Sequence, residues 1–303
     1  MMTPDGRFVA FGSRVAWWNS TNNIYVWDAM TAVRVYTNTV ANLGLMGISA
    51  DGNRLAFSDG SQLYLADRSA NTVLSLGVTP GLGQPPPKFS ANSRLLVFSQ
   101  STAGANQVYL YDCLAGTSEL VSHRFDSALV PANGLSDSPD LSPDGRFVAY
   151  CSSAVDVVGG NPNSIRNIVM YDTQTGSNTL VSVGVGGRSS GNNASLRPMF
   201  SADGQTILFE SWTEDLAQRD FNQSSDLFAY TLLLAKLTPQ PGPGFRVMWK
   251  AVPGKSYRLQ FKNNLDEPSW QNAVGSITTM GVNASFQDSS PSGLQRFYRV
   301  VSP

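Results

Sequence analysis

Residues 142–150 read SPDGRFVAY, which is a polar turn followed by an apolar strand that ends in an aromatic residue. The phrase has four further copies, which start at Thr3, Ser49, Ser90 and Ser201. Each copy continues into a second apolar strand and a polar corner, as NIVMYDTQTG does from Asn167. One supersecondary unit that recurs about every 50 residues is typical of a β-propeller or a solenoid. The repeat therefore predicts an all-β fold with five recognisable units.

The composition excludes several classes of protein. The chain has 303 residues, of which 42% are hydrophobic, and its net charge of −1 does not supply the basic patch of a nucleic-acid binder. No apolar run reaches the ~18 residues of a membrane-spanning helix, and the longest, from Leu227 to Leu237, is interrupted by Lys236. Cys113 and Cys151 follow no disulfide or metal-binding pattern, so we predict that both are unpaired. We expect neither nucleic-acid binding nor membrane insertion.

Composition changes also predict the domain organisation. Residues 1–237 contain all copies of the repeated phrase and form the predicted propeller. The segment 238–244, TPQPGPG, contains three prolines that stiffen the chain, and it indicates a linker between domains. Residues 245–303 contain short apolar strands separated by turns and no copy of the phrase. This pattern predicts a small β-sandwich.

The first copy of the phrase lacks the strand that precedes the turn in later copies. Met1 and Met2 lead directly into Thr3. We expect that the chain begins at an internal methionine of a longer protein and that a signal peptide lies upstream. A propeller that is truncated at its N-terminus would also leave a blade edge exposed, through which copies of the chain would self-associate.

Phrases such as SPDGRFVAY, NIVMYDTQTG and LVSV resemble the TolB-like, WD-type β-propeller repeats of bacterial envelope and secreted proteins, over about residues 3–237. The tail, from GFRVMWKAVPGKSYRLQF to QRFYRV, resembles the fibronectin-like modules of large secreted bacterial proteins. The resemblance implies four-stranded antiparallel blades around a central channel, and a periplasmic or secreted location. Asn92 and Ser93 depart from the Asp-Gly of the other repeats, and five repeats are fewer than most members have.

The last two repeats align without a gap from Tyr150 and Phe209 onward, and this alignment pairs Asp156 with Asp215. Upstream, both repeats contain Asn-x-x-Ser-x-x-Pro, starting at Asn133 and Asn192. If the repeated turn joins the innermost strand to the second, the long loops 152–167 and 211–226 lie on the opposite face, near the channel mouth. Loops on a rigid scaffold are where binding residues collect. We therefore expect an unknown protein, peptide or small ligand to bind on this long-loop face.

Oxygen-bearing side chains on this face suit a divalent cation. Asp220, Asn222 and Asp226 are closely spaced hard oxygen donors of the kind that Ca²⁺ requires. Asn133, Asn192 and Asp215 add further candidate ligands for Ca²⁺ or another divalent cation. Asp and Asn side chains also cap turns with their own oxygens, and we favour this simpler role.

Candidate catalytic residues are few. Glu210 lies beside Trp212, an environment that can suit a carboxylate for general acid or base work, although a solvated loop edge is the interpretation that we favour. His123 is the only histidine, and the aligned position is Val183, which indicates an ordinary strand residue rather than a catalytic base. Around a channel cation, Asp140 and Glu210 would act with the two asparagines of the repeated Asn-x-x-Ser motif as a metal-assisted hydrolase site.

Two functions of different classes follow. We favour a ligand- or protein-binding β-propeller of an extracytoplasmic bacterial protein. The alternative is a metal-dependent hydrolase of the lactonase or phosphotriesterase kind, with its site at the channel mouth. The glycine-rich stretch Gly184–Gly191 includes GRSSG, which matches Gly-x-Ser-x-Gly, but it precedes an inner strand and not a helix, so we expect a flexible interblade loop rather than a nucleophile elbow. The sequence does not contain a complete phosphate-binding Gly-x-x-x-x-Gly-Lys-Ser/Thr motif.

Overall fold

The computed structural model describes residues 1–14, 21–80, 85–102, 105–160, 163–185, 190–218, 220, 222–233, 235–241, 244–251, 255–280, 283–289 and 295–302. In these residues all regular structure consists of β-strands, as the sequence predicts. The part of the chain that is described contains no helix with the length and apolar character to cross a bilayer. Two compact units divide the chain, Met1–Tyr230 and Thr231–Pro303.

The repeated phrase forms the same hydrogen-bonded turn in all five copies. In the fourth copy, the Ser142 hydroxyl donates to Asp144 at 2.6 Å and accepts from the Phe147 amide at 2.8 Å, while Asp144 accepts from the Arg146 amide at 3.0 Å. The same three bonds recur at Thr3, Ser49, Ser90 and Ser201. Short polar side chains that bond to nearby backbone fix a turn in this way. The polar residues of the phrase are therefore structural.

The last position of the turn has a left-handed backbone, which favours glycine. Gly145 has φ 78° and Gly204 has φ 69°, whereas the third copy places Ser93 there at φ 60°. The Ser93 hydroxyl accepts a hydrogen bond from the Asp51 amide at 3.2 Å, in the turn of the preceding repeat. This bond offsets the strain, and it gives a structural reason for the departure from Asp-Gly.

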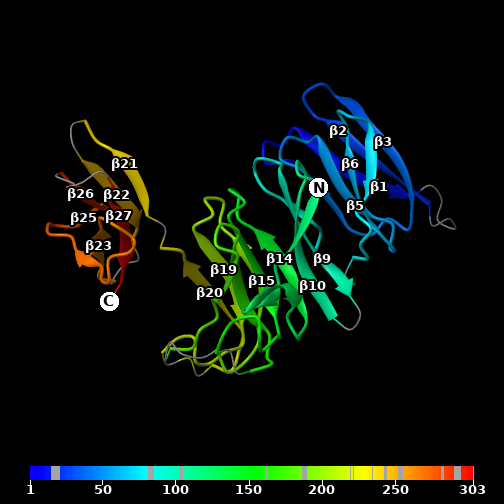
Figure 1. Ribbon diagram of the computed structural model, residues 1–303. Coiled ribbons are helices and arrows are strands. Elements are labelled where there is room, and N and C mark those ends of the chain that lie inside the picture. The colour runs from blue at the N-terminus through cyan, green and yellow to red at the C-terminus, as the bar shows by residue number, and fades with distance from the viewer. Residues whose placement is uncertain are drawn as a thin grey trace. The chain divides into compact units, whose positions relative to one another are not determined.

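Besides one two-stranded hairpin, the described residues of the first unit form five antiparallel sheets, and each is a meander of consecutive strands, as in the blades of a β-propeller (Figure 1). Blade 1 contains β1 (Phe8–Arg14), β2 (Thr21–Asp28) and β3 (Val33–Ala41). Blade 2 contains β4 (Met46–Ile48), β5 (Arg54–Ser58), β6 (Leu63–Asp67) and β7 (Thr72–Ser75). Blade 3 contains β8 (Lys88–Phe89), β9 (Leu95–Thr102), β10 (Ala105–Asp112) and β11 (Thr117–Leu120).

The remaining blades are longer in their connecting loops. A hairpin of β12 (His123–Arg124) and β13 (Ser127–Pro131) follows blade 3. Blade 4 contains β14 (Ser136–Leu141), β15 (Phe147–Ser152), β16 (Asn167–Asp172) and β17 (Ser177–Leu180). Blade 5 contains β18 (Ser195–Phe200), β19 (Thr206–Ser211) and β20 (Asp226–Thr231). The first unit is thus built of β-propeller blades.

Each blade has two faces that pack on different neighbours. In the strand after the turn, the second and fourth residues pack against the preceding blade and the third packs against the following blade. We call these the upstream face and the downstream face. The clusters that show this arrangement are Ala10 with Leu55 and Phe57, Ala56 with Leu96 and Phe98, and Val97 with Val148 and Tyr150. Alternation of side chains along a strand produces the two faces.

The second unit consists of two antiparallel sheets. One has the strand order β21 (Lys236–Pro239), β22 (Phe245–Lys250), β26 (Asn283–Asp288) and β25 (Thr278–Met280). The other has the order β24 (Gln271–Asn272), β23 (Arg258–Lys262) and β27 (Phe297–Val301). Both sheets contribute to one buried cluster, made of Val247, Trp249, Leu259, Ala284 and Phe286. The fibronectin-like sandwich itself stays a prediction.

The linker prediction for residues 238–244 is wrong in part. Thr238 and Pro239 belong to β21, where they pair with Arg246 and Phe245 of β22. The Gln240 amide also donates to the Gly244 carbonyl at 3.3 Å. A proline lacks only the backbone donor, so it is tolerated at the end of an edge strand. The division between the units lies earlier than predicted, after Tyr230.

Both cysteines are free, as predicted. Burial raises the pKa of the Cys113 thiol and of the Cys151 thiol to about 11. Thiols of this kind remain protonated at neutral pH and are poor nucleophiles. The two cysteines therefore belong to the packing of the blades.

Candidate functional site

The long loop of blade 4 is held by a reciprocal pair of side chains. The Asp156 carboxylate accepts a hydrogen bond from the Asn133 amide at 2.8 Å, and the Asn133 side chain accepts from the Val155 amide at 3.1 Å. The Asp156 carbonyl also accepts from the Phe125 amide at 2.9 Å, which joins the β12–β13 hairpin to the loop. We call this set of three bonds an Asn–Asp clasp. It fastens three separate segments together.

Blade 5 contains the same clasp at the aligned positions. The Asp215 carboxylate accepts from the Asn192 amide at 3.0 Å, and the Asn192 side chain accepts from the Glu214 amide at 3.2 Å. The Asp215 carbonyl accepts from the Val185 amide at 2.7 Å. The recurrence agrees with the gapless alignment of the two repeats. Asn133, Asn192 and Asp215, which are candidate metal ligands in the sequence, thus act as loop caps.

The two clasped loops form one continuous surface. Asn163, in the loop of blade 4, donates from its side chain to the Gly191 carbonyl, beside the clasp of blade 5, at 2.9 Å. Large apolar side chains remain exposed around the clasps, and they are Phe125, Leu129, Val130, Val155, Val185 and Trp212. Leu129 is 91% exposed and Phe125 is 60% exposed. Exposed apolar groups on hydrogen-bonded loops are typical of an interaction surface.

The other candidate cation ligands are Asp220, Asn222 and Asp226, and two of them are hydrogen-bonded to each other. The Asn222 side chain donates to the Asp226 carboxylate at 3.1 Å and accepts from the Ser224 amide at 2.8 Å, so it caps its own turn. Asp220 is partly buried. In the described residues, no three His, Cys, Asp or Glu side chains come together as a metal-binding group. A cation at Asp220, Asn222 and Asp226 stays a prediction.

Asp140 has a structural role between blades. It is 4% exposed, and its carboxylate accepts from the Lys88 ammonium of β8 at 2.7 Å and from the Phe200 amide of β18 at 2.7 Å. One side chain on the first strand of blade 4 therefore joins the first strands of blades 3 and 5. A catalytic acid or base needs a proton position open to substrate, and both oxygens of Asp140 have a protein partner.

The remaining catalytic candidates, Glu210 and His123, have partners of their own. The Glu210 carboxylate is paired with Arg197 at 3.5 Å. His123 is 4% exposed, its Nδ1 donates to the Arg124 carbonyl at 2.7 Å, and its ring stands edge-on to Tyr171. Nε2 of His123 is buried and has no hydrogen-bond partner among the described residues. The arrangement fits the expectation that His123 is a strand residue.

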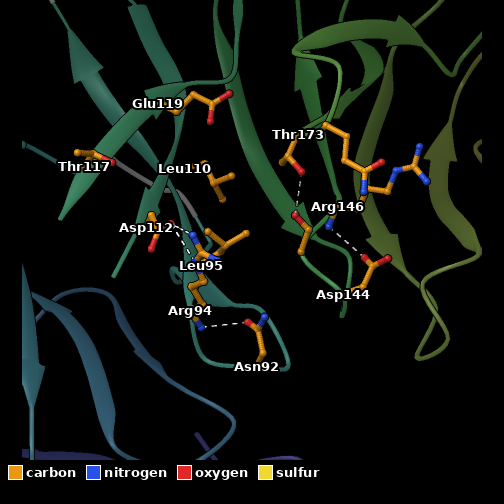
Figure 2. Close-up of a pocket in the computed structure, with 12 residues that line it drawn as sticks. Asn92, Arg94, Leu95, Leu110, Asp112, Thr117, Glu119, Asp144, Arg146 and Thr173 are labelled. Carbon is orange, nitrogen blue, oxygen red and sulfur yellow. Dashed lines mark hydrogen bonds and ion pairs between the residues drawn. The ribbon is translucent and has the colours of Figure 1, made fainter. Parts of the chain in front are cut away.

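A groove between blades 3 and 4 was not predicted from the sequence. It has a volume of about 410 Å³. Figure 2 shows Asn92, Arg94 and Asp112 of blade 3 on one side, and Asp144 and Thr173 of blade 4 on the other. It lies at the repeated turns, away from the clasped loops. No motif in the repeated turns indicates a groove, because a groove between two blades depends on how the blades stack.

Ion pairs define the electrostatics of the groove. Arg94 donates to Asp112 at 2.6 and 2.9 Å, and this hydrogen bonding lowers the pKa of Asp112 to about 2. Arg146 pairs with Asp172 in the same way at 3.0 Å. An Arg–Asp pair at these positions also occurs in blade 1, between Arg7 and Asp28. Each pair joins the start of one strand to the end of the next strand. Because Arg and Asp recur at the same positions of the repeat, the sequence could have predicted these pairs.

Comparison with known proteins gives likeness in structure alone. No protein-family model matches the chain, and no curated protein matches it in sequence. TolB from Acinetobacter baumannii is 18% identical, with a TM-score of 0.43, over 82% of this chain and 50% of that chain. The β-propeller domain of Swd1 from Myceliophteria thermophila is 10% identical, with a TM-score of 0.46, over 82% of this chain and 81% of that chain. Dipeptidyl peptidase 4 from Porphyromonas gingivalis is 14% identical, with a TM-score of 0.47, over 82% of this chain and 43% of that chain.

The chain thus spans about half the length of the first of these proteins. All three are similar to this chain at identities below 20%, which is too low to transfer a ligand or an activity. The TM-scores of these three are all below 0.5, so the assignment of blades depends on the strand order described above.

Proposed function

We propose that the first unit is a scaffold that binds a protein or peptide on its long-loop face. The observation that carries the proposal is the pair of Asn–Asp clasps, which hold the loops while large apolar side chains around them stay exposed. A periplasmic or secreted location is part of the proposal, and its support is the resemblance to TolB-like repeats.

The clasps favour binding because they order the loops in advance. A loop that is flexible before binding loses conformational freedom in the complex, which costs affinity. Each clasp fixes its loop through two side-chain bonds and one backbone bond, so less freedom remains to be lost. The same bonds engage one lone pair of each side-chain oxygen that a metal-assisted hydrolase would need at Asn133 and Asn192. For this reason binding has better support than hydrolysis.

Apolar and aromatic residues favour a protein or peptide as the ligand. Aromatic side chains at the centre of an interface contribute a large share of binding energy. Trp212 is 45% exposed and Phe125 is 60% exposed, and each lies beside one of the two clasps. A peptide that crosses both clasps would contact both rings.

The experiment selects binders from a phage-displayed library of random linear peptides with the purified protein. Affinity of the enriched peptides is then measured by fluorescence anisotropy for wild type, Phe125→Ser and Trp212→Ser. Each substitution is expected to weaken binding by about tenfold, which corresponds to ~1.4 kcal/mol. Leu114→Ser is the matched control, because Leu114 is 71% exposed at the polar corner after β10. Peptides that fail to enrich, or that lose no affinity with either loop variant, would overturn the proposal.

A further inference from the structure

The groove between blades 3 and 4 corresponds to places that arginine side chains occupy at the two preceding blade boundaries. At each boundary, the last residue of the repeated turn lies against the blade before it. A Cβ atom on Gly52 would meet the Phe8 ring of blade 1, and a Cβ atom on Gly145 would meet the Leu95 side chain of blade 3. Phe8 and Leu95 hold the same position of the repeat. The boundaries can therefore be compared side chain by side chain.

An arginine occupies the boundary between blades 1 and 2. Arg68 follows the end of β6, and its Nη1 donates to the Gly52 carbonyl. Its guanidinium also lies 4.7 Å from the centre of the Phe8 ring. Asp28 of blade 1 and Asp51 of blade 2 interact with Arg68 electrostatically as opposite charges. One guanidinium thus meets a carbonyl, a ring and two carboxylates.

A second arginine occupies the boundary between blades 2 and 3. Arg54 donates from its Nη1 to the Ser93 carbonyl at 3.0 Å. Ser93 is the last residue of its turn, so its carbonyl corresponds to that of Gly52. Arg54 and Arg68 come from different positions of the repeat. Two separate positions therefore deliver a guanidinium to the same kind of carbonyl.

The boundary between blades 3 and 4 has neither of these two arginines. Thr173 stands at the position of Arg68, and Leu95 stands at that of Arg54. The Gly145 carbonyl accepts from the Thr173 hydroxyl at 3.4 Å (Figure 2). Both side chains are shorter than arginine, which explains why a groove of about 410 Å³ remains at this boundary. Sites for small ligands have volumes of ~300–1,000 Å³.

The groove also retains the carboxylates that accompany an arginine elsewhere. Asp112 and Asp144 line it, and they correspond to the two carboxylates that interact with Arg68. Asp112 is paired with Arg94 at 2.6 Å. Asp144 bonds within its own turn through Oδ1, and its Oδ2 has no partner among the residues that the structure describes. Glu119 adds a further negative charge to the groove. A carboxylate oxygen is thus left for a cation.

We propose that this groove binds an alkylguanidinium group, the chemistry that free arginine and an arginine side chain of a partner share. The guanidinium donates to the Gly145 carbonyl and to the Asp144 carboxylate, and its alkyl chain packs on Leu95. A guanidinium carries five N–H donors in a planar fork, so it can reach a carbonyl and a carboxylate together, whereas a lysine ammonium is a compact point charge. The groove lies away from the clasped loops, so the inference does not depend on peptide binding there.

The test follows the amide signals of Gly145 and Thr173 by NMR while a probe is added. The probes are free arginine, the capped tripeptide acetyl-Gly-Arg-Gly-amide and the matched tripeptide with lysine. Both arginine probes should shift these signals to saturation, and the lysine peptide should bind about tenfold more weakly. Tighter binding of the arginine tripeptide assigns the ligand to a partner chain, and tighter binding of free arginine assigns it to the free amino acid.

Three variants test the site itself. Asp144→Asn removes the charge and keeps the turn, because Asn92 makes the same turn bonds in blade 3. It should weaken binding of the arginine tripeptide about tenfold. Thr173→Arg places a guanidinium in the groove from within and should abolish binding. Asp5→Asn is the matched control, since it removes the same charge from the turn of blade 1 and should leave the affinity unchanged.

Thermal denaturation of each variant shows whether its fold is intact. An arginine tripeptide that does not bind, or that binds no more tightly than the lysine tripeptide, would overturn the proposal. Folded Asp144→Asn with wild-type affinity would also overturn it, as would folded Thr173→Arg that still binds the tripeptide.

Discussion

Blades 4 and 5 start from nearly the same phrase, yet their strands differ in burial. All six residues of β15 in blade 4 are buried, whereas β19 in blade 5 alternates between buried and partly exposed positions. The turns that precede the two strands make the same hydrogen bonds. The phrase therefore sets the local hairpin, and the neighbouring blades set how much of it is buried.

Blades 4 and 5 also differ in the ion pairs and hydrogen bonds that join their strands. Blade 4 joins Arg146 to Asp172, while blade 5 has Gln205 and Thr231 at the aligned positions. Blade 4 also contributes Asp140 to both of its neighbours, whereas blade 5 has Met199 at that position. Blade 4 is thus the more strongly connected of the two, and substitutions at aligned positions should reveal it.

The largest effect is expected from Ile168→Ala, which is compared with Leu227→Ala at the aligned position of blade 5. Ile168 is fully buried, so its truncation leaves a cavity and should lower the free energy of unfolding by about 3 kcal/mol. Leu227 is 75% exposed, and its truncation should change the free energy by less than about 0.5 kcal/mol. Urea denaturation at low protein concentration measures both. Equal losses would show that the downstream face of blade 5 is covered in the monomer.

The next largest effect on stability is expected from removing the bonds that Asp140 makes to the two neighbouring blades. Asp140→Ala leaves the Phe200 amide without its acceptor, and we expect a loss of about 2 kcal/mol in the free energy of unfolding. Lys88 is partly exposed and regains water, so it adds little to that loss. Met199→Ala, at the aligned exposed position, should be close to neutral. If Asp140→Ala left thermal stability unchanged, the proposed connection between the three blades would be wrong.

A smaller and local effect is expected at the clasps. Asp215→Ala removes the acceptor of the Asn192 amide, which should cost about 1 kcal/mol and speed hydrogen exchange at that amide. The Asn133 amide belongs to the other clasp, so its exchange rate should not change. Asp156→Ala should give the reverse pattern. Exchange measured by NMR tests both variants, and a uniform change at the two amides would argue against separate clasps.

The smallest effect is a pH dependence at the Arg94–Asp112 pair of blade 3. Blade 5 has no Arg–Asp pair at the aligned positions, which are Gln205 and Thr231. Arg94 holds the pKa of Asp112 at about 2, below its unfolded value, so the pair stabilises the fold above pH ~4 and ceases to do so as pH falls through about 2. Arg94→Gln should raise the pKa of Asp112 in an NMR titration. The difference in Tm between variant and wild type should be full at neutral pH and should vanish near pH 2. A titration of Asp112 that is identical in the two proteins would contradict the assignment.

The sequence predicted the parts of the fold that depend on neighbouring residues. The five turns and the hairpins after them follow from Ser, Asp and Gly at fixed spacing, and the alignment of Asp156 with Asp215 correctly indicated a shared local geometry. It could not show that Lys88 meets Asp140, since that contact depends on how blades stack. For the same reason, Asp140 looked available for catalysis. The linker prediction is wrong in part because prolines that stiffen the chain also fit a strand end, which is where Pro239 lies.

The central claim is that aligned residues of blades 4 and 5 are buried in one blade and exposed in the other, and thiol labelling tests it most directly. Cysteine is placed at position 168 or 227 by Ile168→Cys or Leu227→Cys, each combined with Cys113→Ser and with Cys151→Ala, because Cys151 lies opposite position 168. Alkylation is followed by mass spectrometry at low protein concentration. The account predicts rapid labelling at position 227 and labelling at position 168 only as fast as the blade opens. Equal rates at the two positions would contradict it.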